Sequence, residues 1–423
     1  MVEYKKAEAI MKKFLDSFNK WSNNVFENFN KFFRKHLLLI VFIVLSLIAL
    51  AMRILFIDYL SGDMASFLVP WFNYFRENGH FLALKTIDQA TNNDYLLGYN
   101  NLLALMSYFG GRPIAIIKSI SFFFDFALAI GVGLVTYHFS RKKITFLISY
   151  LIVLFAPSVF ANSALWGQCD QIYVCLIVYT FLLFLKKKNI LGSLLLGIAF
   201  SFKIQTIFFV PLLGFMWLNK KYRLWYLLLI PVGFMISALP CYFVGGEFVK
   251  PFLIIGKQFG EYSNLNYGAG SMYAFLEMTL LAECFNKGVS ILFALAVLLF
   301  IMFVLYYKKV ECNENNMLYV AALYAIVTPF VLPHMHERYF FMADMFILMY
   351  VIVRKKQYYL APLMIFSSVN NYTHFLTGEY IFKFLGQDCV RLSATINLAI
   401  IIILLVNMRE LFPKKEPELI DNN

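Results

Sequence analysis

The chain has 423 residues, of which 61% are hydrophobic and 18% aromatic, and its formal net charge is +12. A soluble protein of this composition would lack the polar side chains needed to cover its core, so the sequence predicts a membrane protein. The basic residues occur in short runs between apolar segments, which is typical of membrane-protein loops and argues against nucleic-acid binding. The six cysteines have neither metal nor disulfide spacing, so we expect small buried side chains.

Residues 1–35 combine basic and apolar side chains, and the apolar ones recur at spacings of three and four. This pattern predicts a basic amphipathic helix on the cytoplasmic leaflet, and a solvated helix packed on the protein is the alternative. We expect three regions, namely this segment, a membrane domain over 36–410 and a cytoplasmic tail over 411–423.

Apolar runs predict an all-α fold of about twelve membrane-spanning helices, because a span needs about 20 apolar residues and fewer inside a bundle. The predicted spans are 37–57, 114–138, 144–161, 171–185, 189–202, 204–218, 224–244, 288–307, 316–332, 337–353, 357–369 and 391–408. An even number of spans places both termini on one side of the membrane. We also expect juxtamembrane helices in the long outer loops, one of them over 95–109.

Short runs of Lys and Arg fall in alternate loops of this topology. They are 141–143, 186–188, 220–223, 308–309 and 354–356. The positive-inside rule therefore predicts that these loops and both termini are cytoplasmic. In the alternative, segments 189–202 and 204–218 form one broken helix and an interfacial helix. The orientation of every later span in the membrane would then be reversed. The basic run at 220–221 argues against that reversal.

Four polar features then converge on the outer face, and ionisable residues held at membrane depth are functional candidates. The features are Asp63 after the first span, Trp166, Gln168 and Asp170 before the fourth, Lys203 and Gln205 between the fifth and sixth, and the segment 333–341. The outer segment 262–273, which includes Tyr267, carries hydroxyls, amides and aromatic rings. These groups suit sugar binding and equally suit an interfacial loop.

The carboxylate of Asp63 suits a general base or a divalent-cation ligand, and a solvated loop aspartate is the alternative. Asp170 begins a predicted helix, so it fits a helix cap and a site role equally. Lys203 either extends its ammonium group toward the membrane surface or binds a phosphate, and we favour the phosphate.

Pro333 suits the first turn of a helix, so we expect the tenth span to begin there with a free N-terminus that binds anions. Arg338 can bind a phosphate through two parallel hydrogen bonds. His334 would share its helix face, whereas His336 would point elsewhere. A metal site at His336 and Glu337, and a structural ion pair between Glu337 and Arg338, are the alternatives.

Four short motifs follow one another along the chain. They are Gly62-Asp63, Trp166-Gly167-Gln168 with Asp170, Phe202-Lys203-Ile204-Gln205 with Pro211, and His336-Glu337-Arg338-Tyr339-Phe340. This set resembles the GT-C superfamily of integral-membrane glycosyltransferases and is most similar to its GPI-mannosyltransferase-like bacterial branch. The resemblance implies a plasma-membrane enzyme that transfers a hexose, with inversion, from a polyprenyl-phosphate donor to a hydroxyl of an extracytoplasmic cell-envelope acceptor.

The resemblance also implies roles for single residues. Asp63 corresponds to the catalytic base or metal-linked acidic residue of the family. Lys203 and Arg338, with His334 or His336, correspond to the residues near the donor phosphate. The candidate substrate-binding residues are Trp166, Gln168, Gln205, Tyr267 and Glu337.

One departure from the family pattern concerns the metal. Met64 follows Asp63 where a second acidic residue is common in the family, so a divalent cation (Mg²⁺ or Mn²⁺) would need Asp170 as its second ligand. Two other functions stay open. A transporter or flippase of lipid-linked sugars would bind phosphate but would not need Asp63, and an envelope-polymer ligase or polymerase would act on similar substrates.

Overall fold

The computed structural model describes residues 1–261, 264–276 and 286–413. The chain divides into two compact units, Met1–Ala49 and Leu50–Asn423. Part of the predicted cytoplasmic tail, 414–423, lies outside the described residues.

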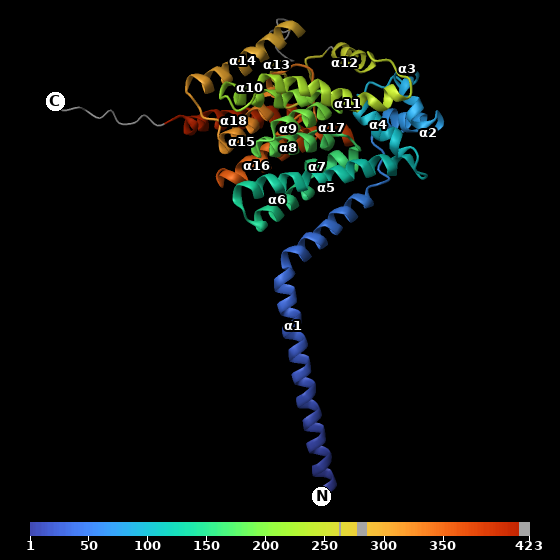
Figure 1. Ribbon diagram of the computed structural model, residues 1–423, viewed down its shortest axis with the longest axis vertical. Helices are drawn as coiled ribbons and strands as arrows, with labels where there is room; N and C mark the ends of the chain where they lie inside the picture. Colours follow the sequence, from blue (N-terminus) through green and yellow to red (C-terminus); the bar gives the residue numbers. More distant parts are fainter. Residues whose placement is uncertain (262–263, 277–285, 414–423) are drawn as a thin grey trace, which may run out of the picture. The chain divides into compact units, whose positions relative to one another are not determined.

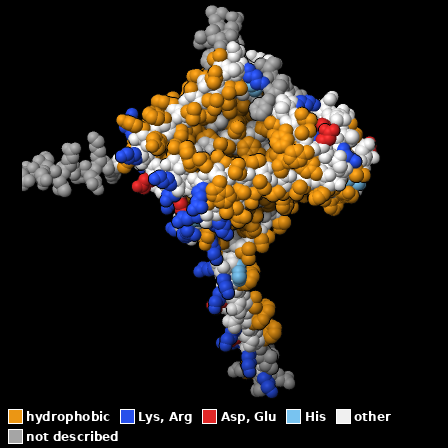
Figure 2. Space-filling view, turned by 45° about the horizontal axis from the view of Figure 1, so that its top comes forward, with side chains coloured by type: hydrophobic (Ala, Val, Ile, Leu, Met, Phe, Trp, Pro, Cys, Tyr) orange, Lys and Arg blue, Asp and Glu red, His pale blue; other side chains and the backbone are white. Residues whose placement is uncertain are grey.

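The first unit belongs to a single long helix, α1 (Val2–Leu55). The helix continues from the basic segment 1–35 into the apolar run of the first predicted span. Figure 2 shows hydrophobic side chains along one side of this helix and Lys and Arg along the other. The exposed apolar side chains include Phe14, Phe18, Trp21, Phe26, Phe29 and Phe32. The predicted amphipathic helix is therefore present, and its position on a membrane stays a prediction.

The second unit is a bundle of helices (Figure 1). Its α-helices are α2 (Val69–Glu77), α3 (Ile87–Ala90), α4 (Leu97–Met106), α5 (Pro113–Ser140), α6 (Lys143–Phe155), α7 (Pro157–Phe160), α8 (Asp170–Leu185), α9 (Asn189–Phe200), α10 (Val210–Leu218), α11 (Leu229–Phe243), α12 (Lys250–Glu261), α13 (Tyr273–Leu276), α14 (Lys287–Tyr307), α15 (Glu314–Val331), α16 (Phe341–Arg354), α17 (Leu360–Thr377) and α18 (Asp388–Asn407). The π- and 3₁₀-helical turns are η1 (Met64–Leu68), η2 (His80–Lys85), η3 (Ala161–Trp166), η4 (Ile204–Phe209), η5 (Leu224–Leu228), η7 (Lys383–Leu385) and η8 (Met408–Leu411). Each predicted span overlaps one or more of these helices, so the all-α prediction is confirmed for the described part of the chain.

Five helices in the described ranges are long and apolar enough to cross a membrane, or six if a bent pair counts as one span. That pair is Lys143–Phe155 and Pro157–Trp166, whose axes differ by 48°. Pro157 explains the bend, because proline lacks the amide hydrogen that would continue the first helix. The predicted number of twelve spans is not confirmed, since several of the remaining apolar helices have only 10–17 residues.

Helices α15 and α16 form the centre of the bundle. Every residue of Asn316–Val331 and of Phe341–Val351 is buried. Both sequences are apolar around the whole helix circumference, which suits a helix enclosed by neighbours on all sides. Figure 2 shows that the surface of the unit also carries broad hydrophobic areas, as expected of a protein in lipid. The five described cysteines, Cys169, Cys175, Cys241, Cys312 and Cys389, are buried and free.

The connection between α15 and α16 differs from the prediction. Met335–His336 forms the strand β2, which pairs in parallel with β1 (Asn266–Tyr267). The backbone amide of His334 also donates to the carbonyl of Leu265 at 2.8 Å. The predicted helix start at Pro333 is therefore wrong, because α16 begins only at Phe341. Pairing with a segment about 70 residues upstream outweighs the local preference of proline for a first helical turn.

Candidate active site

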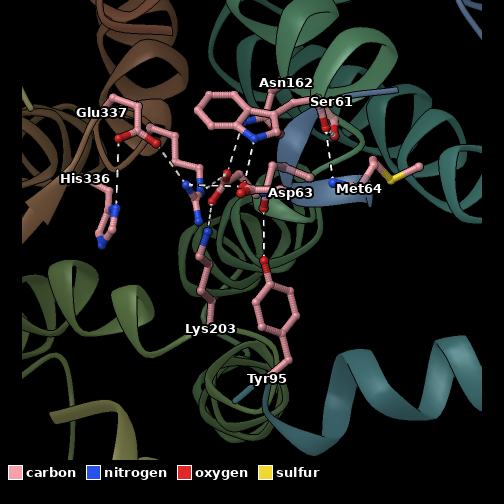
Figure 3. A network of polar contacts seen from close by, with 12 residues as sticks. Ser61, Asp63, Met64, Tyr95, Asn162, Lys203, His336 and Glu337 are labelled. Atoms are coloured by element: carbon pink, nitrogen blue, oxygen red, sulfur yellow. Dashed lines mark hydrogen bonds and ion pairs between the residues drawn. The ribbon is translucent and has the colours of Figure 1, made fainter. Parts of the chain in front are cut away.

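The carboxylate of Asp63 lies just before η1 and is held from one side. Its Oδ2 accepts hydrogen bonds from Trp166 Nε1 at 2.9 Å and from Gln168 Nε2 at 2.5 Å (Figure 3). Between these donors, Gly167 has a φ of +73°, and a Cβ there would lie 2.8 Å from Met64 Sδ. Glycine is therefore required for the turn that brings both donors to the same oxygen.

The carboxylate of Asp170, at the N-terminus of α8, is fully buried and binds two side chains closely. Oδ1 forms an ion pair with Lys203 Nζ, and Oδ2 accepts a hydrogen bond from Asn162 Nδ2 at 3.0 Å. The ammonium group of Lys203 also lies 5.3 Å from the ring centre of Tyr339 and 5.8 Å from that of Tyr173. Lys203 thus points inward to a carboxylate and aromatic rings, as a buried cation requires.

The guanidinium group of Arg338 lies among three carboxylates. Nη1 is 2.9 Å from Glu337 Oε1 and 4.0 Å from Asp63 Oδ2, and Nε is 3.6 Å from Asp170 Oδ2. The same group stacks over Trp166 at 5.3 Å from the ring centre. Burial raises the pKa of the Glu337 carboxyl above its usual value, and the charge of Arg338 opposes that rise. Arg338 therefore joins the Asp63 and Asp170 parts of the site into one charged network.

The imidazole of His336 lies at the edge of this network. Its ring stacks on Tyr267 with centres 4.8 Å apart, and Nδ1 is 3.9 Å from Glu337 Oε2. Burial, followed by the positive charges of Arg338 and Lys203, lowers the pKa of His336 to about 2. The ring is therefore neutral at physiological pH, and it can contribute hydrogen bonds and stacking to a substrate but not a positive charge.

This neutral histidine predicts a pH dependence of stability. An unfolded histidine has a pKa near 6.5, so between that value and about 2 only the unfolded state binds the proton. Acidification below pH 6.5 then destabilises the fold by at most about 1.4 kcal/mol for each pH unit. When the pH is lowered from 6.5 to 5, we expect the melting temperature of His336→Gln to fall less than that of the wild type. Thermal unfolding in detergent measures this difference. The control is His374→Gln at an exposed histidine, and equal acid sensitivity of the His336→Gln variant and the wild type would contradict the expectation.

Most of the predicted site residues lie in this network, and two do not. His334 Nδ1 lies 2.6 Å from the backbone oxygen of Asn264, so its ring is engaged by the neighbouring loop. Gln205 is buried within η4, two residues after Lys203. Tyr267 contacts the network through its stack on His336.

The carboxylates do not fit a divalent cation in this arrangement. In the described ranges, no group of three or more His, Cys, Asp or Glu side chains has the geometry of a metal site. Arg338 lies within 4.0 Å of both Asp63 and Asp170, and Lys203 pairs with Asp170 as well. Two protein cations thus already compensate the oxygens that a metal would need.

Two residues of the network were not predicted. The hydroxyl of Tyr95 donates to Gln168 Oε1 at 3.0 Å, and burial raises its pKa well above 10. Asn162 donates to Asp170 from η3. Asn162 was detectable as an amide near the end of a predicted apolar span. Tyr95 carries no such signal, because aromatic residues are common throughout this chain.

The chain was also compared with known proteins. A family model described as glycosyltransferase family 87 matches residues 101–333, which is more than half of the chain. The matched region includes Trp166, Gln168, Asp170 and Lys203, whereas Asp63 and Arg338 lie outside it. None of the curated proteins compared with the chain matches it.

Proposed function

Because the chain belongs to glycosyltransferase family 87, we propose that it transfers a hexose from a polyprenyl-phosphate donor to a hydroxyl of an extracytoplasmic acceptor, with inversion. Family membership makes the protein a glycosyltransferase of the membrane. The donor class, the acceptor and the stereochemical course are our proposal.

One observation carries the proposal, namely that the Asp63 carboxylate lies in one network with two cations. It is 4.0 Å from Arg338 Nη1, and Asp170 connects Arg338 to Lys203. Both hydrogen bonds to Asp63 end on Oδ2, and the proposal assigns Oδ1 to the acceptor hydroxyl. In an inverting transfer the acceptor oxygen attacks the anomeric carbon as its proton passes to a base. The bond to the donor phosphate breaks in the same step, so no nucleophile from the protein is needed. Asp63 is proposed as that base.

The leaving group is a polyprenyl phosphate, whose negative charge increases as the sugar bond breaks. Lys203 and Arg338 are the cations placed to stabilise that charge. In the present structure they are paired with Asp170 and Glu337. The donor phosphate would join these pairs, as a further partner of both cations.

The lipid part of the donor would lie in the membrane beside the long apolar helices. The arrangement of basic loops supports an active site on the outer face of the plasma membrane, with both termini in the cytoplasm. A carrier of the undecaprenyl type and a cell-envelope glycan fit this location.

The proposal is tested with purified protein in nanodiscs and labelled hexoses on synthetic polyprenyl phosphates. We expect transfer of the sugar to a glycan acceptor and retained activity in a metal chelator, since Arg338 lies between the carboxylates. Transfer from a nucleotide sugar alone would refute the proposed donor. Movement of labelled lipid across vesicles without consumption of donor would favour a flippase instead. Loss of transfer in the chelator would instead support the predicted divalent-cation site at Asp63 and Asp170.

A further inference from the structure

A stripe of polar residues runs along one face of the otherwise apolar helix α5. Lys118, Ser121 and Asp125 are three and four residues apart, so they lie on the same side of the helix. All three are fully buried, although α5 is long and apolar enough to span a membrane. Buried ionisable groups at membrane depth are costly, so each needs partners and is a functional candidate.

The ammonium group of Lys118 binds three backbone carbonyls. Nζ donates to the oxygens of Phe56 at 2.8 Å, Tyr59 at 2.6 Å and Ala164 at 2.7 Å. These bonds use all three hydrogens of the ammonium group. Two of the acceptors follow the C-terminus of α1, where unpaired carbonyls favour a cation, and the third lies in η3.

The other residues of the stripe hold the same two segments. Ser121 Oγ donates to the backbone oxygen of Gln168 at 2.7 Å. Asp125 Oδ2 pairs with Arg53 Nε at 2.7 Å, and Arg53 also donates to the backbone oxygen of Leu154 at 3.0 Å. One face of α5 thus binds the chain before Asp63, Ala164 within η3 and Gln168 after η3.

These two segments carry the parts of the site that must meet. Tyr59 precedes Asp63 by four residues, and Ala164 precedes Trp166 by two. The hydrogen bonds on Asp63 Oδ2 come from Trp166 and Gln168, so the relative placement of the segments sets the position of the carboxylate. Lys203 and Arg338 lie on other parts of the chain, and their shortest ion pairs are with Asp170 and Glu337 rather than with Asp63.

We propose that Lys118 is a positioning residue for the transfer reaction, which fixes Asp63 by holding the segment 56–59 against Ala164. The inference rests on the proposed function of Asp63 as the base. Displacement of a reacting group by about 1 Å can cost about 100-fold in rate. Loss of Lys118 should therefore lower kcat and leave the affinity for the donor unchanged, because the phosphate-binding cations keep their places.

The test compares Lys118→Met, which keeps the length of the side chain but loses its donors, with Lys118→Arg, which keeps a charged donor. We expect Lys118→Met to lower kcat about 10- to 100-fold with unchanged donor affinity, and Lys118→Arg to recover a large part of the loss. The control is Lys142→Met at an exposed lysine.

Hydrogen–deuterium exchange gives a readout that does not depend on activity. Lys118→Met should accelerate exchange at residues 60–68 and 163–170 and leave α15 and α16 unchanged. If Lys118→Met does not fold, Ser121→Ala removes the neighbouring hydrogen bond of α5 to the backbone oxygen of Gln168 and should accelerate exchange at residues 163–170. The inference would be overturned if folded variants kept the kcat of the wild type. It would also be overturned if kcat fell while hydrogen exchange accelerated equally in all helices. The two proposals can also fail separately. If Lys118→Met shows the local loosening but the wild type transfers no sugar from lipid donors, the proposed function is refuted. The role of Lys118 in holding the two segments together would still stand.

Discussion

Asp63→Asn is expected to lower kcat by about 1,000-fold while donor affinity and thermal stability stay close to those of the wild type. General-base catalysis contributes about 100- to 10,000-fold to a rate, and asparagine cannot take the acceptor proton. Its amide oxygen can still accept the hydrogen bonds that Trp166 and Gln168 now donate to Asp63 Oδ2. The substitution therefore removes the base and keeps the geometry. Steady-state transfer with saturating donor and acceptor measures the loss.

The matched control is Asp58→Asn, which changes an aspartate of the same segment whose side chain is 65% exposed. This control should transfer sugar at the wild-type rate. If Asp63→Asn retains transfer within about tenfold, Asp63 is not the base. Asp170, which is paired with Lys203, would then become the next carboxylate to test.

Arg338→Lys is expected to raise the apparent KM for the donor about 10- to 100-fold with a smaller change in kcat. Lysine keeps the charge but cannot bind a phosphate through two parallel hydrogen bonds, and it reaches Asp170, Glu337 and Asp63 less well at the same time. Arg338→Ala should weaken donor binding further. It also leaves three carboxylates in a buried site without their shared cation, so a loss of melting temperature should accompany it.

Donor binding is measured with a labelled polyprenyl-phosphate hexose and an inactive Asp63→Asn background, so that turnover does not interfere. Arg112→Lys, at an arginine with a 63% exposed side chain, serves as the control. An unchanged donor affinity in Arg338→Lys and Arg338→Ala would remove Arg338 from the phosphate site. It would then be an ion-pair residue of Glu337 and Asp170.

The sequence could predict that the main polar side chains of the site come together, because this follows from the order of the helices. Asp63, Asp170, Lys203 and Arg338 each lie at a junction between apolar segments, and alternate junctions of a membrane bundle share a face. The structure brings these four side chains together. Their catalytic roles stay predictions.

Other features could not be predicted, because they depend on contacts between distant segments. The ion pair of Lys203 with Asp170 was not expected, whereas the pairing of Arg338 with Glu337 was the stated alternative to phosphate binding. The parallel pairing of Met335–His336 with Asn266–Tyr267 has no local signal, since two residues are too few for a strand pattern. The polar stripe on α5 was not predicted, because its partners lie on distant segments.

The small sheet between β1 and β2 has a consequence for the timing of the reaction. The backbone bonds that join the two segments include His334 N to Leu265 O at 2.8 Å and Glu337 N to Tyr267 O at 3.2 Å. Each is worth about 1 kcal/mol net, so these backbone bonds alone hold the two segments weakly. The segment that carries Arg338 is held more firmly by its ion pairs with Asp170 and Glu337 and by the buried ring of Phe340. Movement of this segment during the reaction therefore requires these ion pairs to separate, which couples arrival of the lipid phosphate to their exchange.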